Sequence, residues 1–148
     1  MAHDDRRIID VVGAKDGSPV TDIVELSLPV KADLVVLARL TAATVASRAD
    51  FDIEEIEDLR LAVDELCVSL VRDHIDGRLV LRFSRDEDLI EVEWTFRSAP
   101  GGPGDPLTHR SEGLSERILG ALVDEHGYDN QDDTPRAWLR KRRARQQA

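Results

Sequence analysis

The sequence predicts an α+β fold, a two-layer sandwich in which three helices cover one face of a mainly antiparallel sheet. Apolar residues recur at the 3.6-residue period of a helix in three stretches, and strand-like stretches lie between them. The elements follow in the order strand, helix, helix, strand, strand, loop, helix, strand. The 148 residues fit one compact domain. We therefore expect a mobile N-terminal arm at 1–21, one domain at 22–142 and a basic C-terminal tail at 143–148.

A strand and a helix follow the N-terminal arm. Val24 to Leu28 alternates in the manner of a half-buried strand, and Pro29 closes it. From about residue 32 to residue 48, apolar residues recur at helical spacing, and abundant alanine favours a helix. The predicted apolar stripe of this helix consists of Leu34, Leu37, Thr41 and Val45.

A long helix is predicted between Phe51 and Gly77, and the rest of the chain is organised around it. Asp52 and Glu55 have the spacing of a capping box, in which each side chain accepts a hydrogen bond from the other residue's backbone N–H. Gly77 can adopt the positive φ that terminates a helix. The stripe predicted to face the core consists of Ile56, Leu59, Val63, Leu66, Cys67 and Leu70.

The opposite side of this helix carries a candidate site. At about 100° per residue, Glu65 and Ser69 lie one above the other, with Leu61, Ala62 and Val68 beside them. An apolar setting for a carboxylate and a hydroxyl suggests a face turned toward a pocket or a partner. The alternative is a surface glutamate and an incidental serine on a helix that packs on two sides.

The second half of the chain predicts a hairpin, a loop, a third helix and a last strand. Residues 79–83 and 90–96 alternate around a polar turn, which indicates an antiparallel hairpin. The stretch 98–112 is rich in glycine and proline and predicts a loop. We expect a helix at 113–125, an acidic turn at 129–133 and a final edge strand at 136–140.

Composition narrows the class of protein. The formal net charge of −10 argues against a primary role on DNA or RNA, whose phosphates would repel most of the surface. No apolar run approaches the roughly 20 residues that span a bilayer, and the N-terminus lacks signal-peptide character, so we expect a cytoplasmic protein without membrane contact. Cys67 is expected to be a buried apolar side chain, and the histidines show no metal-ligand spacing.

One basic run interrupts the acidic composition. Residues 140–145 carry five positive charges. Such a run can touch nucleic acid or an acidic protein, but it is more often a solvated tail that offsets local acidity.

The run Leu59 to Cys67 resembles the N-box helix of the anti-sigma factor and serine protein kinase family, which belongs to the histidine-kinase-like ATPases. In that family a glutamate serves as general base or water organiser, and an asparagine four residues later holds magnesium. The resemblance implies these roles for Glu65 and Ser69. Ser69 departs from the pattern, because a hydroxyl is shorter than an amide and cannot reach a metal as its carbonyl does.

The two glycine motifs of the family are also incomplete. The resemblance implies an adenine-binding D-x-G-x-G motif with its glycines at Gly102 and Gly104, which puts Pro100 where the aspartate should be. Proline offers neither a carboxylate nor an N–H. The phosphate-binding G-x-G motif keeps Gly113 and has Ser115 as its third residue. The five candidate nucleotide-binding residues are therefore Glu65, Ser69, Gly102, Gly104 and Gly113, in a degenerate site.

The resemblance implies an anti-sigma factor that sequesters an alternative sigma factor and is released by an anti-anti-sigma antagonist, with ATP binding weak or lost. It also implies a homodimer. The alternative is an active serine/threonine kinase that uses ATP and magnesium, with Glu65 as base, to phosphorylate the antagonist. A third option is an acidic scaffold or dimerisation module without a sigma partner.

Overall fold

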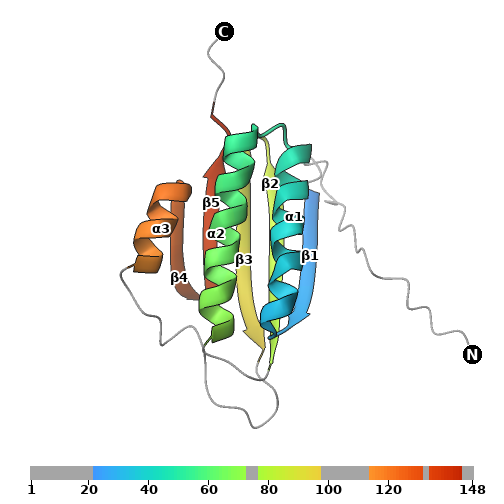
Figure 1. The fold of residues 1–148 in the computed structure, drawn as a ribbon, viewed down its shortest axis with the longest axis vertical. Coiled ribbons are helices and arrows are strands. Elements are labelled where there is room, and N and C mark those ends of the chain that lie inside the picture. Colours follow the sequence, from blue (N-terminus) through green and yellow to red (C-terminus); the bar gives the residue numbers. More distant parts are fainter. Residues whose placement is uncertain (1–21, 73–76, 98–113, 132–133, 145–148) are drawn as a thin grey trace, which may run out of the picture.

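The protein is a five-stranded antiparallel sheet with three helices on one face, as the computed structural model in Figure 1 shows. The structure describes residues 22–72, 77–97, 114–131 and 134–144. The helices are α1 (Val35–Arg48), which follows the 3-10 turn η1 (Ala32–Leu34), α2 (Ile53–Arg72) and α3 (Leu114–Leu122). The strands are β1 (Asp22–Pro29), β2 (Arg78–Asp86), β3 (Leu89–Arg97), β4 (Glu125–Gln131) and β5 (Thr134–Arg142). The predicted fold class is confirmed.

The strand order is β1-β2-β3-β5-β4, and three predictions about the C-terminal half were wrong. Helix α3 ends at Leu122, and much of the stretch predicted as an acidic turn belongs to β4. Strand β5 is paired on both sides, with β3 and with β4, so it is not an edge. Gly127 fits this pairing, because a Cβ there would lie 2.8 Å from the Trp138 ring. The strands β1, β2 and β3 confirm the predicted first strand and hairpin, each with extra residues.

Helix α1 lies on the sheet through a different stripe from the predicted one. Its buried residues are Val35, Ala38, Ala42 and Ala46. Leu37, which was expected in the core, is 40% exposed, and Leu34 and Val45 only flank the core. Small alanine side chains allow a helix to approach its neighbours closely. The alanine side of α1 is therefore the buried one, although leucine side chains would bury more apolar area.

The predicted start of α2 is confirmed by both bonds of the capping box. The Asp52 N–H donates to Glu55 Oε1 at 3.0 Å, and the Glu55 N–H donates to Asp52 Oδ1 at 2.8 Å. Glu55 is buried, and its other oxygen accepts the Ala144 N–H at 2.6 Å. The C-terminal end of the described chain is thereby attached to the first turn of α2.

The core stripe of α2 agrees with the prediction. Leu59, Val63, Leu66, Cys67 and Leu70 are buried, and Ile56 packs against them. The Trp94 indole N–H donates to Cys67 Sγ at 3.2 Å, and burial raises the pKa of this thiol to about 12.

Gly77 has the positive φ that the sequence suggested. Its φ is 136°, and a Cβ would come within 2.5 Å of the Phe96 ring. The Val30 N–H donates to the Gly77 carbonyl, which joins the end of β1 to the start of β2. Residues 73–76, including His74, lie outside the described residues.

The basic run near the C-terminus is largely built into the sheet. Arg140, Lys141 and Arg142 belong to β5 and form ion pairs. Lys141 also donates to the Leu122 carbonyl at 2.8 Å. These cations therefore offset neighbouring carboxylates, as the sequence indicated, but from strand positions. Among the described helices, none is long and apolar enough to cross a membrane.

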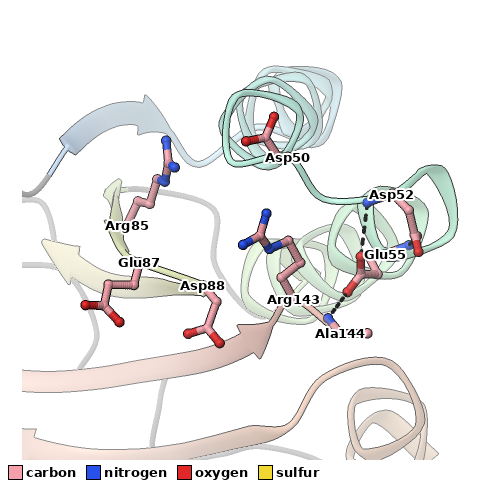
Figure 2. A pocket seen from close by; sticks show the side chains of 8 residues that line it. All are labelled: Asp50, Asp52, Glu55, Arg85, Glu87, Asp88, Arg143 and Ala144. Atoms are coloured by element: carbon pink, nitrogen blue, oxygen red, sulfur yellow. Dashed lines mark hydrogen bonds between the residues drawn. The ribbon is translucent and has the colours of Figure 1, made fainter. Parts of the chain in front are cut away.

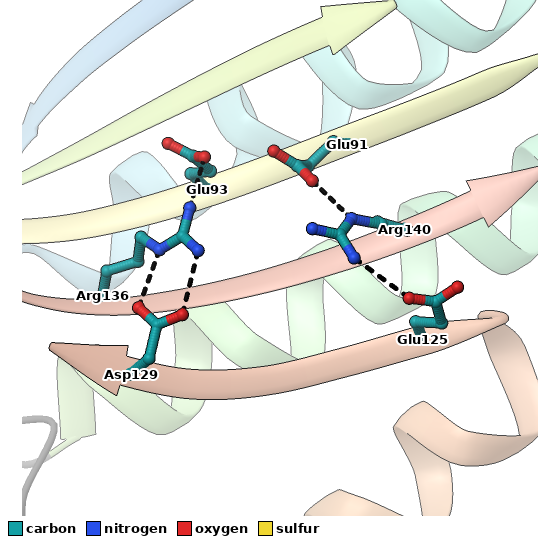
Figure 3. A network of polar contacts seen from close by, with 6 residues as sticks. All are labelled: Glu91, Glu93, Glu125, Asp129, Arg136 and Arg140. Carbon is teal, nitrogen blue, oxygen red and sulfur yellow. Dashed lines mark hydrogen bonds and ion pairs between the residues drawn. The ribbon is translucent and has the colours of Figure 1, made fainter. Parts of the chain in front are cut away.

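The uncovered face of the sheet carries two rows of charge across three strands, as Figure 3 shows. In one row Arg136 bridges Glu93 at 2.6 Å and Asp129 at 2.8 Å. In the other, Arg140 bridges Glu91 and Glu125. The Arg140 guanidinium also lies 4.5 Å from the Trp138 ring centroid. This face is therefore held together by its own cross-strand ion pairs.

The bidentate contact with Arg136 lowers the pKa of Asp129 below its ordinary value. A carboxyl group whose pKa is lower in the folded state stabilises the fold at pH values above its unfolded-state pKa, which is about 3.9 for aspartate. This stabilisation is lost as the pH falls through the folded-state pKa. Asp129→Asn should therefore lower the urea midpoint at pH 7, and its difference from the wild type should shrink below about pH 4. A difference that stays constant between pH 7 and pH 3 would contradict this assignment. The measurement is urea denaturation at several pH values.

Candidate functional site

Two of the residues singled out in the sequence meet between α2 and α3. The Ser115 hydroxyl, in the first turn of α3, donates to Glu65 Oε1 at 3.1 Å. Ser115 is buried and Glu65 is partly buried. The two residues are 50 positions apart. A hydrogen bond to a carboxylate is stronger than one between neutral groups, so this contact helps to hold α3 beside α2.

The surroundings of Glu65 on α2 agree only in part with the prediction. Ser69 lies one turn after Glu65 and is partly exposed. Leu61 and Val68 are 48% and 39% exposed, so the apolar side chains expected near Glu65 do face outward. Ala62 is fully buried, and its expected place on the open face was wrong. Ala62 lies at the edge of the buried side of α2, and this buried side covers a wide part of the helix surface.

The predicted glycine motifs cannot be compared with the structure. Pro100, Gly102, Gly104 and Gly113 lie outside the described residues. The roles that the resemblance implies for them stay predictions. Of the candidate nucleotide-binding residues, the structure therefore places Glu65 and Ser69, and it adds Ser115 as a neighbour of Glu65.

A cleft of about 840 Å³ lies at the other end of α2, as Figure 2 shows. Its lining residues are Asp50, Asp52, Glu55, Arg85, Glu87, Asp88, Arg143 and Ala144. None of the candidate residues is among them. At 1.5 Å per residue, Glu65 is about 15 Å along the helix axis from Glu55. The cleft and the predicted site are therefore separate features.

The cleft is charged, and none of its described lining residues is a serine, threonine, cysteine, lysine or histidine. The Arg85 guanidinium donates to the Arg48 carbonyl at 3.1 Å, and the Arg143 guanidinium points into the space between the carboxylates. Asp50 and Glu87 have positive φ values of 59° and 50°, which mark the tight turns at its rim. The sequence did not indicate this cleft, because its residues come from two turns, a helix start and the end of β5.

Comparison with known proteins places the chain in a family. No family model matches it. The serine-protein kinase RsbW of Bacillus cereus (strain B4264) is 32% identical over 118 residues, which cover 69% of this chain and 74% of that protein. The protein of the same name from Bacillus subtilis (strain 168) is 32% identical over 117 residues, covering 70% and 72%. The chain belongs to the RsbW family.

Two further matches are shorter or more distant. The Bacillus pumilus (strain SAFR-032) RsbW is 40% identical over 77 residues, and the match spans 48% of each chain. A crystal structure of the RsbU and RsbW domains of a Mycobacterium tuberculosis protein matches with a TM-score of 0.63. It is 18% identical, and the match covers 84% of this chain and 33% of that one. At this identity the structural match supports the RsbW-like fold.

Ser115→Ala tests the contact between α2 and α3 in this RsbW family member. The substitution removes the donor to Glu65 and should lower the free energy of unfolding by about 1.5–3 kcal/mol, as for other hydrogen bonds to charged groups. Ser69→Ala, which removes a partly exposed hydroxyl one turn from Glu65, is the matched control and should stay within about 0.5 kcal/mol of the wild type. Urea denaturation measures both. Equal effects of the two substitutions would show that the contact contributes nothing specific.

Proposed function

We propose that this protein is an anti-sigma factor that sequesters an alternative sigma factor and is released by an anti-anti-sigma antagonist, with ATP binding that is weak or lost. The main observation in support of a lost nucleotide function is the hydrogen bond that Ser115 donates to Glu65. In the family pattern the third residue of the phosphate-binding G-x-G motif is a glycine without a side chain. Here that position is a serine whose hydroxyl engages the expected catalytic carboxylate.

The described residues fit a magnesium nucleotide poorly. Magnesium prefers near-ideal octahedral oxygen coordination, and one short hydroxyl replaces the amide carbonyl of the family pattern at Ser69. One oxygen of Glu65 is already engaged by Ser115. Among the described residues, no group of three or more histidine, cysteine or carboxylate side chains is arranged to hold a metal. We therefore assign no chemical step to this site.

Electrostatics support a basic protein partner. Sigma factors contact DNA through basic surfaces, and a protein of net charge −10 attracts such surfaces at long range. The resemblance of the chain to the anti-sigma factor and serine protein kinase family supports a sigma factor and an antagonist as partners. The proposal places the complex in the cytoplasm and takes the protein to be a homodimer.

An active kinase is the second candidate function. It is favoured by the name of the relatives, serine-protein kinase RsbW, and by the presence of Glu65 at the position of the general base. On this reading Glu65 activates a serine or threonine hydroxyl of the antagonist while ATP and magnesium are held despite the altered motifs.

Affinity capture tests the sequestering function. The full chain, immobilised and exposed to a lysate of its source cell at low salt, should retain an alternative sigma factor that mass spectrometry identifies. Capture should weaken as salt rises, because screening reduces attraction between the acidic chain and a basic partner. Failure to recover any sigma factor at low salt would contradict the proposal.

Glu65→Gln separates the two candidate functions. Calorimetry of the wild type with ATP and magnesium should show no dissociation constant tighter than about 1 mM. Glu65→Gln keeps the side-chain volume and should leave sigma affinity within the roughly 0.5 kcal/mol of a neutral substitution. If the protein is a kinase, phosphotransfer to the antagonist should instead fall by about 10²- to 10⁴-fold. Wild-type phosphotransfer that vanishes in the variant would overturn the loss of nucleotide function.

A further inference from the structure

The arginines in the middle of the uncovered sheet face are matched by carboxylates on both neighbouring strands. Arg136 and Arg140 of β5 each form ion pairs with one carboxylate of β3 and one of β4. Arg82 of β2 lies directly opposite Glu25 of β1 and Glu93 of β3. Opposite charges on neighbouring strands stabilise a sheet, so these rows support the fold.

The row at one end of β2 and β3 departs from this pattern. Arg78 lies directly opposite Arg97 of β3, and its partner on β1 is Pro29. The adjacent residues Leu79 and Phe96 pack in the core, and side chains alternate along a strand, so both arginines are on the uncovered face. Both are exposed. Among the ion pairs of the described residues, none includes either guanidinium. We call Arg78 and Arg97 the arginine pair.

The backbone holds the arginine pair in place. Gly77, directly before Arg78, packs so closely on β3 that a Cβ there would lie 2.8 Å from the Arg97 carbonyl oxygen. The Gly77 carbonyl also accepts the Val30 N–H at 3.2 Å, which ties this end of β2 to β1. Residues directly opposite on antiparallel strands have Cβ atoms about 4.5–5.5 Å apart, and like charges there destabilise a sheet. The arginine pair therefore weakens the free protein.

We propose that the arginine pair is a docking site for an acidic segment of a partner protein. A carboxylate placed between the two guanidiniums would relieve their repulsion and accept charge-assisted hydrogen bonds from both. The next row of the same face contains Ser27, Val80 and Thr95, which carry no charge. A segment that continues from the arginine pair along β1, β2 and β3 therefore meets no carboxylate in that row.

An acidic protein segment fits this surface better than a free anion or a nucleic acid. The arginine pair lies on an exposed sheet face, whereas small ligands bind in concave pockets that surround them. The net charge of −10 disfavours a nucleic acid, because its long phosphate backbone would meet the acidic remainder of the surface. This inference goes beyond the proposed function, because that function calls for a basic partner and the arginine pair selects an acidic one.

The stability of two variants tests whether the arginine pair serves the fold. Arg78→Gln combined with Arg97→Gln removes the repulsion, so at low salt its urea midpoint should equal or exceed that of the wild type. Arg82→Gln is the matched control on the same face of β2, and it should lower the midpoint because it leaves two carboxylates without their cross-strand cation. A double variant less stable than the wild type would show that the pair supports the sheet, and would overturn the argument for a ligand.

Binding of an acidic peptide to the full chain tests the docking site directly. The probe is a labelled peptide of about ten residues that repeats Glu-Ser, with blocked ends, and fluorescence anisotropy at low salt measures its affinity. The double variant should bind it at least about 10-fold more weakly than the wild type, as for lost hydrogen bonds to charged groups. Arg82→Gln should bind within about 2-fold of the wild type, and a peptide that repeats Gln-Ser should not bind.

Three outcomes would contradict the inference. No binding of the acidic peptide to the wild type, or equal affinity of the wild type and the double variant, would overturn the site. Inorganic phosphate that displaces the peptide at equal concentration would overturn the choice of a protein segment in favour of a free anion. Single-stranded DNA that binds through the same two arginines more tightly than the peptide would overturn that choice in favour of a nucleic acid.

Discussion

Glu55 fixes where α2 begins, and most other features of the molecule depend on that point. One of its carboxylate oxygens accepts the Asp52 N–H, and the other accepts the Ala144 N–H. The first contact sets the helical register, and the second ties the helix start to the end of β5. Because side-chain direction repeats every 3.6 residues, a fixed start decides which residues face the sheet, α1 and α3. A shift of one residue would turn Glu65 away from Ser115.

The sheet is stabilised differently on its two faces. The covered face is apolar, with Leu81, Phe83, Val92 and Trp94 fully buried beneath the helices. On the uncovered face, burial and a hydrogen bond with Glu91 raise the pKa of Glu93, against the attraction of Arg136. The arginines of β5 on this face pair with carboxylates of β3 and β4 across the strands. The outward side of the helix pair, by contrast, exposes aliphatic side chains such as Leu40 and Leu61.

Local signals in the sequence predicted the elements that local interactions specify. The capping box joins residues three apart, and the core stripe of α2 and the hairpin follow from short periodic patterns. The predictions failed where distant pairing decided the outcome. Strand β4 contains the polar run around Tyr128 and Asp129, which has little strand character until β5 pairs with it. The alanine stripe of α1 has less apolar area than the leucines beside it, and only the close approach of a helix to the sheet explains its burial.

For the candidate site too, the short motifs could be predicted from the sequence, and the contact between distant residues could not. Sequence reasoning identified Glu65 and the departures at Ser69 and Ser115, because each can be recognised from a short motif. It could not show that the hydroxyl at Ser115 reaches the carboxylate at Glu65, since the two are 50 residues apart. The structure thus connects the retained residue Glu65 with the departure at Ser115, which the sequence presented as independent. A side chain introduced in the phosphate motif therefore engages the expected base.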